Sequence, residues 1–314
     1  MNMTKRILAF GNPVYDQIVT PRIRTAGRVL SGCSTNACLA VAKLGEAACL
    51  VGCVGADYAG RLKDDLARWD VRLCAHESPQ TGGFSLIYDD RGDRQLDVLG
   101  VAAPIPVSSP GDHWGESDFV LLGPILGEVQ PELARAIRAQ TPAPILLDPQ
   151  GLLREIRHGS VTHVLTEAYR QTASVATIVK ANEVETYTIT GYWPREAPEA
   201  AVRALLATGG TIAVATLADA GSLIYDGQWL YEIPAYATEA IDPTGAGDTY
   251  AAGFMVQYLE TPDDLLQVGC FASAVASIMV EQVGPDFALN RQVVEQRVSA
   301  LRPLARRRAI AAVA

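Results

Sequence analysis

The residues best suited to catalysis lie between Asp242 and Asp248, in the run Asp-Pro-Thr-Gly-Ala-Gly-Asp. An apolar run from Ala251 to Tyr258 follows at once, so we expect a glycine-rich turn that opens a buried helix. The N–H groups of such a turn point to one place, and the helix dipole favours an anion there. Asp248 puts a carboxylate beside that place, where it is useful as a proton acceptor. Glycine and aspartate at a helix start also serve simply as turn and cap, and this reading stays open.

Further polar residues stand where predicted strands end. They are Asp16, Asn36, Asp148, Asn182 with Glu185, and the stretch from Thr216 to Gly221. Because parallel strands of an open α/β sheet present their carboxyl ends at one edge, we expect these residues to gather around Asp248. Taken one at a time, each of these residues is also explained as a turn or helix-cap residue without a function.

The pair Asn182-x-x-Glu185 begins the helix that follows a strand at 176–180. Oxygen ligands at positions i and i+3 share one helix face, and such ligands suit Mg²⁺. The same spacing is also that of an ordinary helix cap. The motif by itself therefore predicts either a magnesium site or a capped helix start.

Short apolar strands alternate with helices along the chain, which predicts an α/β fold with a doubly wound, mostly parallel sheet. Residues 82–100 read instead as a hairpin around Asp89–Asp93, which we expect to form a lid off the main sheet. A second hairpin is predicted around Asp226 and Gly227. Ser34 or Thr35 is the expected cap of the helix at 34–44, and Arg306–Arg308 is expected to be a solvated helix end.

The composition of the chain limits its partners. A net charge of −9 over 314 residues argues against nucleic acid or an anionic membrane surface as the main partner. No apolar stretch is long enough to span a bilayer. The six cysteines form no C-x-x-C pair and the four histidines show no metal spacing, so we expect reduced thiols, a cytoplasmic location and no zinc.

Four motifs in order give the chain a resemblance to the PfkB (ribokinase-like) family of carbohydrate kinases. Residues 242–248 are similar to the family signature D-T-x-G-A-G-D, and residues 31–45 are similar to its early G-G-x-x-x-N-x-A…L-G signature. Residues 54–60 and Asn182-x-x-Glu185 also fit. The resemblance covers nearly the whole chain and implies a ribokinase-like three-layer α/β/α fold.

The resemblance implies a role for each matching residue. Asp248 would be the catalytic base, and the N–H groups of Gly245, Ala246 and Gly247 would form the anion hole. Asn182 and Glu185 would organise Mg²⁺ with ATP, and Asp16, Gly32 and Asn36 would hold the substrate hydroxyls. Thr216, Gly221 and Thr244 would lie along the ATP. The expected activity is transfer of the γ-phosphate of ATP to a hydroxyl of a sugar or sugar-like alcohol.

The chain departs from the family pattern at Pro243, where relatives have Thr, and at Ser31, where they have Gly. Because proline lacks an N–H and fixes φ, we expect Pro243 to alter the site for a monovalent cation, such as K⁺, that some relatives have. The short segment between Asp16 and Gly32 predicts a reduced lid, built from about 13–30 and 82–100 of a single domain over 1–314. The expected state is a monomer or homodimer. The alternatives are a nucleoside or inositol-type kinase, and a non-catalytic ligand-binding protein of the same fold.

Overall fold

A ten-stranded sheet forms the centre of the computed structural model, which describes residues 4–89, 94–109 and 117–310. Its strand order is β16-β15-β14-β13-β12-β9-β8-β1-β4-β5. The seven strands from β13 to β5 run parallel, and they are β1 (Arg6–Phe10), β4 (Ala47–Gly55), β5 (Arg72–Ser78), β8 (Phe119–Leu122), β9 (Ile145–Leu147), β12 (Ile178–Asn182) and β13 (Ile212–Thr216). Most of their side chains are buried, as the apolar runs predict, because helices cover both faces.

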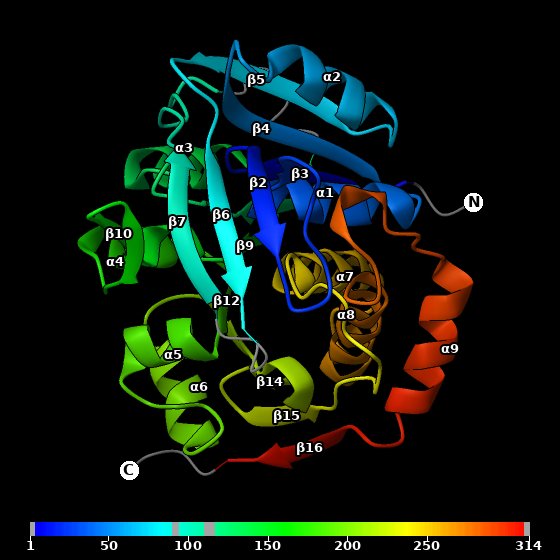
Figure 1. The fold of residues 1–314 in the computed structure, drawn as a ribbon. Coiled ribbons are helices and arrows are strands. Elements are labelled where there is room, and N and C mark those ends of the chain that lie inside the picture. Colours follow the sequence, from blue (N-terminus) through cyan, green and yellow to red (C-terminus); the bar gives the residue numbers. More distant parts are fainter. Residues whose placement is uncertain (1–3, 90–93, 110–116, 311–314) are drawn as a thin grey trace.

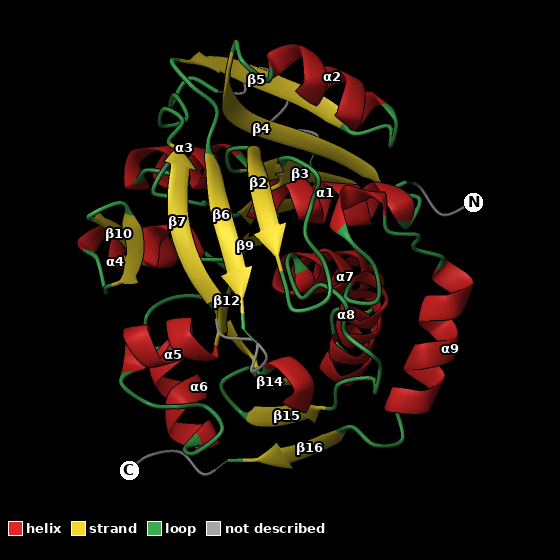
Figure 2. Ribbon diagram, viewed as in Figure 1, coloured by secondary structure: helices red, strands yellow, loops and turns green. Residues whose placement is uncertain are grey.

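Two groups of helices make the outer layers (Figures 1 and 2). One apolar core joins the sheet to α1 (Cys33–Lys43), α2 (Ala59–Ala67), α7 (Ala246–Glu260), α8 (Leu265–Met279) and α9 (Arg291–Leu301). The second core joins it to α3 (Pro131–Gln140), α4 (Glu167–Ala173), α5 (Glu183–Thr190) and α6 (Pro198–Leu206). The predicted doubly wound, mostly parallel α/β architecture is thus confirmed. No helix within the described residues has the length and apolarity to cross a bilayer.

A second sheet, which we call the lid sheet, lies in front of the first in Figure 1. Its order is β10-β11-β7-β6-β2-β3. The segments predicted for it supply β2 (Val14–Val19), β3 (Val29–Ser31), β6 (Gly83–Tyr88) and β7 (Arg94–Gly100). A hairpin of β10 (Arg154–Arg157) and β11 (Ser160–His163) adds two more strands, through a single ladder pair between Ser160 and Asp97. The lid sheet is therefore larger than expected; most of the loop predicted around Asp89–Asp93 lies outside the described residues.

Two local predictions are wrong. Gly32, with φ of 116°, precedes α1 in place of a side-chain cap, and Ser34 Oγ donates instead to the Phe10 carbonyl at 2.8 Å. The basic run at 306–308 lies in strand β16 (Arg306–Ala309), which pairs with β15 (Trp229–Ile233), and is not a helix end. The predicted hairpin at Asp226–Gly227 is confirmed by the pairing of β14 (Ser222–Tyr225) with β15.

Candidate active site

Two glycines in the turn before α7 face polar side chains of other elements. Gly245 has a φ of 86°, in the left-handed region that favours glycine. A Cβ there would lie 2.8 Å from Asn36 Nδ2, and a Cβ on Gly247 would lie 3.0 Å from Lys180 Nζ. The two glycines therefore leave open a space between the turn, an amide and an ammonium. The Ala246 N–H donates to the Pro243 carbonyl at 3.2 Å, so one of the three predicted anion-hole donors is used within the turn.

Asp248 lies in the first turn of α7 and is buried. Asn36 Nδ2 donates to its Oδ2 at 2.9 Å, and Gln150 Nε2 donates to its Oδ1 at 3.3 Å. Burial raises the pKa of Asp248, as does the charge of Asp148, while Lys180 and Asn36 lower it. The structure thus brings two predicted residues, Asp248 and Asn36, into direct contact and gives the carboxylate a raised basicity.

Lys180 is a functional candidate that the sequence interpretation missed. Its Nζ lies 2.5 Å from Asp148 Oδ2, and both side chains are almost completely buried. Burial alone would lower the pKa of Lys180, but Asp148 and then Glu185 hold it above its usual value, so the ammonium stays charged. A buried cation beside Gly247 is well placed to attract an anion. Its position as the last residue of the strand predicted at 176–180, two residues before Asn182, was the signal that could have identified it.

Asn182 and Glu185 form a complete capping box at the start of α5. Asn182 Oδ1 accepts from the Glu185 N–H at 2.9 Å, and Glu185 Oε2 accepts from the Asn182 N–H at 2.8 Å. Burial, followed by the charge of Asp148, raises the pKa of Glu185. The pair is therefore at least a helix cap, and its remaining oxygen lone pairs are of the hard type that Mg²⁺ binds.

Gln150 and Arg154 form a second group that sequence reasoning did not identify. They lie in a 3₁₀ turn at Gln150–Leu153 and at the first residue of β10. Arg154 donates from one terminal nitrogen to Gln150 Oε1 at 2.7 Å and from the other to the Ile125 carbonyl at 2.9 Å. Because Gln150 donates in turn to Asp248, a chain of hydrogen bonds joins the lid sheet to the predicted base.

The lid sheet also contacts the glycine turn directly. Thr244 Oγ1 donates to Tyr88 Oη at 3.0 Å, and Tyr88 is the last residue of β6. Asp16 lies in β2, where its Oδ1 accepts from the Phe84 N–H at 2.8 Å and so ties β2 to β6. A small hollow beneath the lid sheet is lined by Asn12, Val14, Gly82, Phe84 and Ile125. The structure thus places Asp16 in the lid sheet and connects that sheet to Thr244 through Tyr88.

Of the two residues predicted to lie along the donor, Thr216 ends strand β13 and Gly221 follows the 3₁₀ turn Ala218–Ala220. Thr216 is the register partner of Asn182 in the pairing of β13 with β12. Gly221 has a φ of 94°, and a Cβ there would lie 2.0 Å from the Ile233 carbonyl oxygen. Glycine is therefore required at 221 by backbone packing, whatever its part in binding.

Asp242, the first residue of the signature, is completely buried. Its Oδ1 accepts from the Thr244 N–H at 2.9 Å. Its Oδ2 has no hydrogen-bond partner among the described residues, and burial raises the pKa of this carboxyl group. An unpaired buried carboxylate oxygen is costly unless a cation or proton satisfies it. The unpaired carboxylate oxygen of Asp242 is therefore suited to binding a cation.

The sequence matches proteins of known class. A family model described as pfkB family carbohydrate kinase matches residues 10–291. A nucleoside kinase of Methanothermobacter thermautotrophicus is 27% identical over 308 residues, covering 90% of this chain and 92% of the relative. An inositol 3-kinase of Oryza sativa subsp. japonica is 31% identical over 299 residues, covering 88% of this chain and 70% of the relative.

The fold also matches solved structures. A pyrophosphate-dependent kinase in the ribokinase family superimposes with a TM-score of 0.80 at 23% identity. The superposition covers 92% of this chain and 99% of that chain. This likeness confirms the ribokinase-like three-layer arrangement.

Proposed function

This chain belongs to the pfkB family of carbohydrate kinases, and we propose that it transfers the γ-phosphate of ATP to a hydroxyl of a neutral sugar-like alcohol. It is a phosphotransferase with an alcohol group as acceptor, since the relatives it matches are kinases of nucleosides, cytidine and inositol. The observation that carries the proposal is Asp248, a buried carboxylate beside a glycine turn and the ammonium of Lys180. A binding protein has no need of a base at that position.

The residues of the site support a defined division of labour. Asp248 accepts the proton of the acceptor hydroxyl, which attacks the phosphoryl group in line. Asn36 and Gln150 hold the two carboxylate oxygens and so fix the direction of the base. The N–H groups of Gly245 and Gly247 and the ammonium of Lys180 stabilise the charge that develops on the transferred group. Ala246 contributes less than expected because its N–H is bonded to Pro243.

Glu185 and Asn182 are the residues that would hold Mg²⁺ with the donor, directly or through water. Bound Mg²⁺ would supply charge neutralisation between the donor phosphates. We retain Thr216, Gly221 and Thr244 as donor-side residues. The buried Oδ2 of Asp242 supports a monovalent cation such as K⁺ beneath the turn, where its positive charge would stabilise the loop.

The acceptor side is lined by uncharged amides and by the lid sheet. Asn36 and Gln150 flank the base, and both donate and accept hydrogen bonds, as a neutral polyol or nucleoside requires. Asp16 and Gly32 lie at the lid end of this region, and we retain them as substrate-binding residues. A nucleoside and a cyclic polyol such as inositol are both compatible with this lining.

A substrate panel tests the proposal. Purified protein would be assayed with ribose, fructose, adenosine, cytidine and myo-inositol, each with Mg²⁺ and with either ATP or pyrophosphate. Phosphorylation of at least one acceptor from ATP is expected, and its loss in Asp248→Asn would assign it to this site. Phosphorylation with pyrophosphate but not with ATP would show that the phosphate donor is pyrophosphate, and the proposed transfer to an alcohol would still hold. Tight ATP binding without transfer to any member of a broad panel would favour the non-catalytic alternative.

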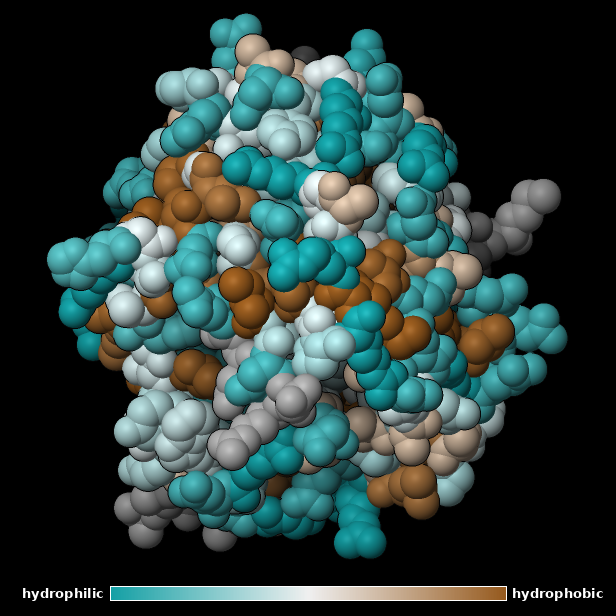
Figure 3. Space-filling view, viewed as in Figure 1, coloured by the Kyte–Doolittle hydropathy of each residue, from teal (hydrophilic) through white to brown (hydrophobic). Residues whose placement is uncertain are grey.

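The proposed oligomeric state is a monomer or a homodimer, and exposed apolar side chains on the lid sheet are the candidate dimer contact. The face of the molecule in Figure 3 is mostly hydrophilic, with apolar groups gathered across its middle, where the lid strands lie. Ile87 on β6 and Ile156 on β10 are both 44% exposed. Light scattering of the purified protein, together with charged substitutions at these two positions, would decide between the two states.

A further inference from the structure

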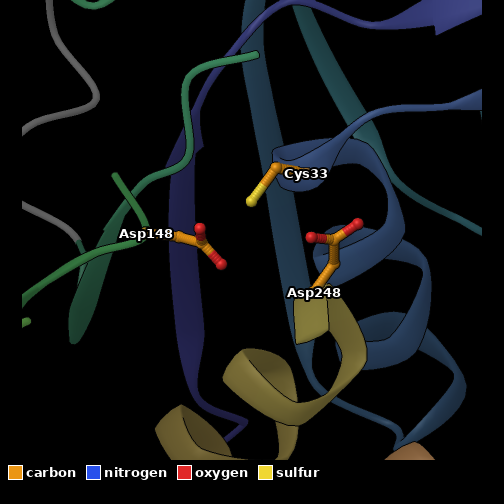
Figure 4. Close-up of side chains that lie close together, drawn as sticks. All are labelled: Cys33, Asp148 and Asp248. Atoms are coloured by element: carbon orange, nitrogen blue, oxygen red, sulfur yellow. The ribbon is translucent and has the colours of Figure 1, made fainter. Parts of the chain in front are cut away.

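Three potential metal ligands converge next to the glycine turn, as Figure 4 shows. Cys33 is the first residue of α1, Asp148 follows β9, and Asp248 lies in the first turn of α7. One ligand atom from each lies within 4.8 Å of the other two, and all three side chains are buried. The sulfur of Cys33 points toward the space between the two carboxylates. The proposed kinase reaction has no use for a thiol at this position.

These three ligands, one thiol and two carboxylates, suit a thiophilic divalent cation. Zn²⁺ binds thiolate sulfur at about 2.3 Å and carboxylate oxygen at about 2.0–2.2 Å, so its ligands stand about 3.5 Å apart in a tetrahedral site. The observed spacing needs only a modest contraction to reach that distance. Mg²⁺ selects oxygen ligands and avoids thiolates, so this set is distinct from the proposed magnesium ligands.

The charges in the cluster also favour a cation. Lys180 is the cation paired with Asp148, and Asp248 and Glu185 contribute two more carboxylates to the same buried region. Among the described residues, the hydrogen bonds to Asp248 come from neutral groups, the amides of Asn36 and Gln150 and the thiol of Cys33. Anionic groups therefore exceed cationic ones among these residues, and buried charge without a partner is costly.

We propose that Cys33, Asp148 and Asp248 bind one thiophilic divalent cation of the Zn²⁺ or Cd²⁺ class, which inhibits phosphoryl transfer. Binding replaces the thiol proton of Cys33 by a metal–sulfur bond, and that proton passes to the solvent. The bound cation occupies the lone pairs of Asp248 that would accept the substrate proton. The inhibitory effect rests on the proposed function, whereas binding of the metal does not.

The site could not be expected from the spacing of cysteines and histidines, because its ligands come from three distant parts of the chain. It revises the expectation, drawn from that spacing, that the protein has no zinc site. Cys33 differs in this respect from the pair Cys49 and Cys74, whose sulfur atoms lie 3.7 Å apart on β4 and β5 and which belong to no such three-ligand cluster within the described part of the chain.

Titration of the metal-free, full-length protein with Cd²⁺ alone tests binding through the ultraviolet charge-transfer band of a cadmium–thiolate bond. The titration is made in Cys49→Ala, a background that removes the competing thiol pair of Cys49 and Cys74. One equivalent of Cd²⁺ per chain should produce the band in this background, and adding Cys33→Ala should abolish it. Asp148→Asn should weaken Cd²⁺ binding by about 100-fold or more, since even outer-shell changes cost up to that factor. A band that survives Cys33→Ala in this background would overturn the assignment.

Inhibition is measured separately, with Zn²⁺ alone added to the phosphotransfer assay at fixed Mg²⁺ and donor. The zinc concentration for half inhibition should rise by about 100-fold in Cys33→Ala, each variant being compared with its own metal-free rate. Equal sensitivity of the two proteins would overturn the inhibitory role. If no acceptor is phosphorylated, the proposed function fails while the cadmium titration still decides the binding site. If Cys33→Ala does not fold, the loss of binding in Asp148→Asn decides it.

Discussion

Helix α7 carries an acid at each end, and the two have opposite protonation behaviour. Asp248 lies in the first turn, where the helix dipole should favour its charge, and Glu260 is the last residue, where the dipole should oppose it. The pKa of Asp248 is nevertheless raised, mainly by burial and then by Asp148. Burial alone would also raise the pKa of Glu260, but hydrogen bonds from Lys5 and Arg291 lower it. A dipole effect of about 0.3–1 kcal/mol is thus outweighed by burial and neighbouring charges.

The difference lies in the direct partners of each acid. At the Glu260 end, two cations contact the acid itself: Lys5 and Arg291 both pair with Glu260, while Lys5 also contacts Glu46 at 3.3 Å and Arg291 contacts Glu295 at 3.8 Å. At the Asp248 end, the amides of Asn36 and Gln150 donate to the acid, and Lys180 is paired with Asp148 instead. The ion pairs of Glu260 tie the segment before β1 to α7 and α9 and stabilise the fold. The neutral partners of Asp248 keep its carboxylate reactive.

The largest expected effect is that of Asp248→Asn on catalysis. Turnover should fall by about 1,000-fold or more, because the variant lacks the base and general-base catalysis contributes about 100- to 10,000-fold. Its thermal stability should hold or rise, since a buried carboxylate with a raised pKa is removed. Steady-state kinetics and a melting curve measure both. Glu260→Gln is the matched control on the same helix and should keep its turnover; equal losses in the two variants would refute the comparison.

Lys180→Met should impair both stability and catalysis. Removing one partner of a buried ion pair typically costs about 3–5 kcal/mol, because Asp148 is left charged and unpaired. Adding Asp148→Asn to the same chain removes the stranded charge and should restore most of the stability without restoring turnover. Urea unfolding and single-acceptor kinetics on the three proteins measure the two effects. A double variant as active as the unaltered protein would show that Lys180 has a structural role alone.

The sequence predicted the parts of this site that depend on local pattern. Apolar runs located the strands, and the expected meeting of Asn36 with Asp248 is observed. The reason differs from the one given, because Asn36 and Asp248 lie in α1 and α7, which follow the antiparallel strands β3 and β15 and not strands of the parallel sheet. The sequence pattern did not identify Gln150 and Arg154. Their role comes from a chain of hydrogen bonds that ends at Asp248, about 100 positions away along the chain. Strands β10, β11 and β16 were missed for a related reason. They are short and polar, and long-range pairing stabilises them more than their own periodicity does.

The pH dependence of catalysis should distinguish two neighbours of Asp248. The base acts when deprotonated, so kcat/KM should fall as the pH drops through its pKa. Asp148→Asn removes a charge that raises this pKa and should move the acid limb to lower pH. Asn36→Ala removes a hydrogen bond that lowers it and should move the limb to higher pH. Shifts of the same sign in both variants would refute the proposed electrostatics, whatever their effects on KM.

The smallest expected effect is at the ion-paired end of α7, in Glu260→Gln. Because the folded-state pKa of Glu260 is lowered, its charge contributes stability above the unfolded-state pKa of about 4.3. That contribution is lost as the pH falls through the lower, folded-state value. The substitution should therefore reduce the unfolding free energy by about 1 kcal/mol at neutral pH, as for a partly exposed ion pair, and by less in acid. Urea unfolding at neutral and acidic pH measures the difference. A larger loss in acid than at neutral pH would mean that Glu260 is held by packing of its side chain, and that the contrast between the two ends of α7 does not arise from ion pairing.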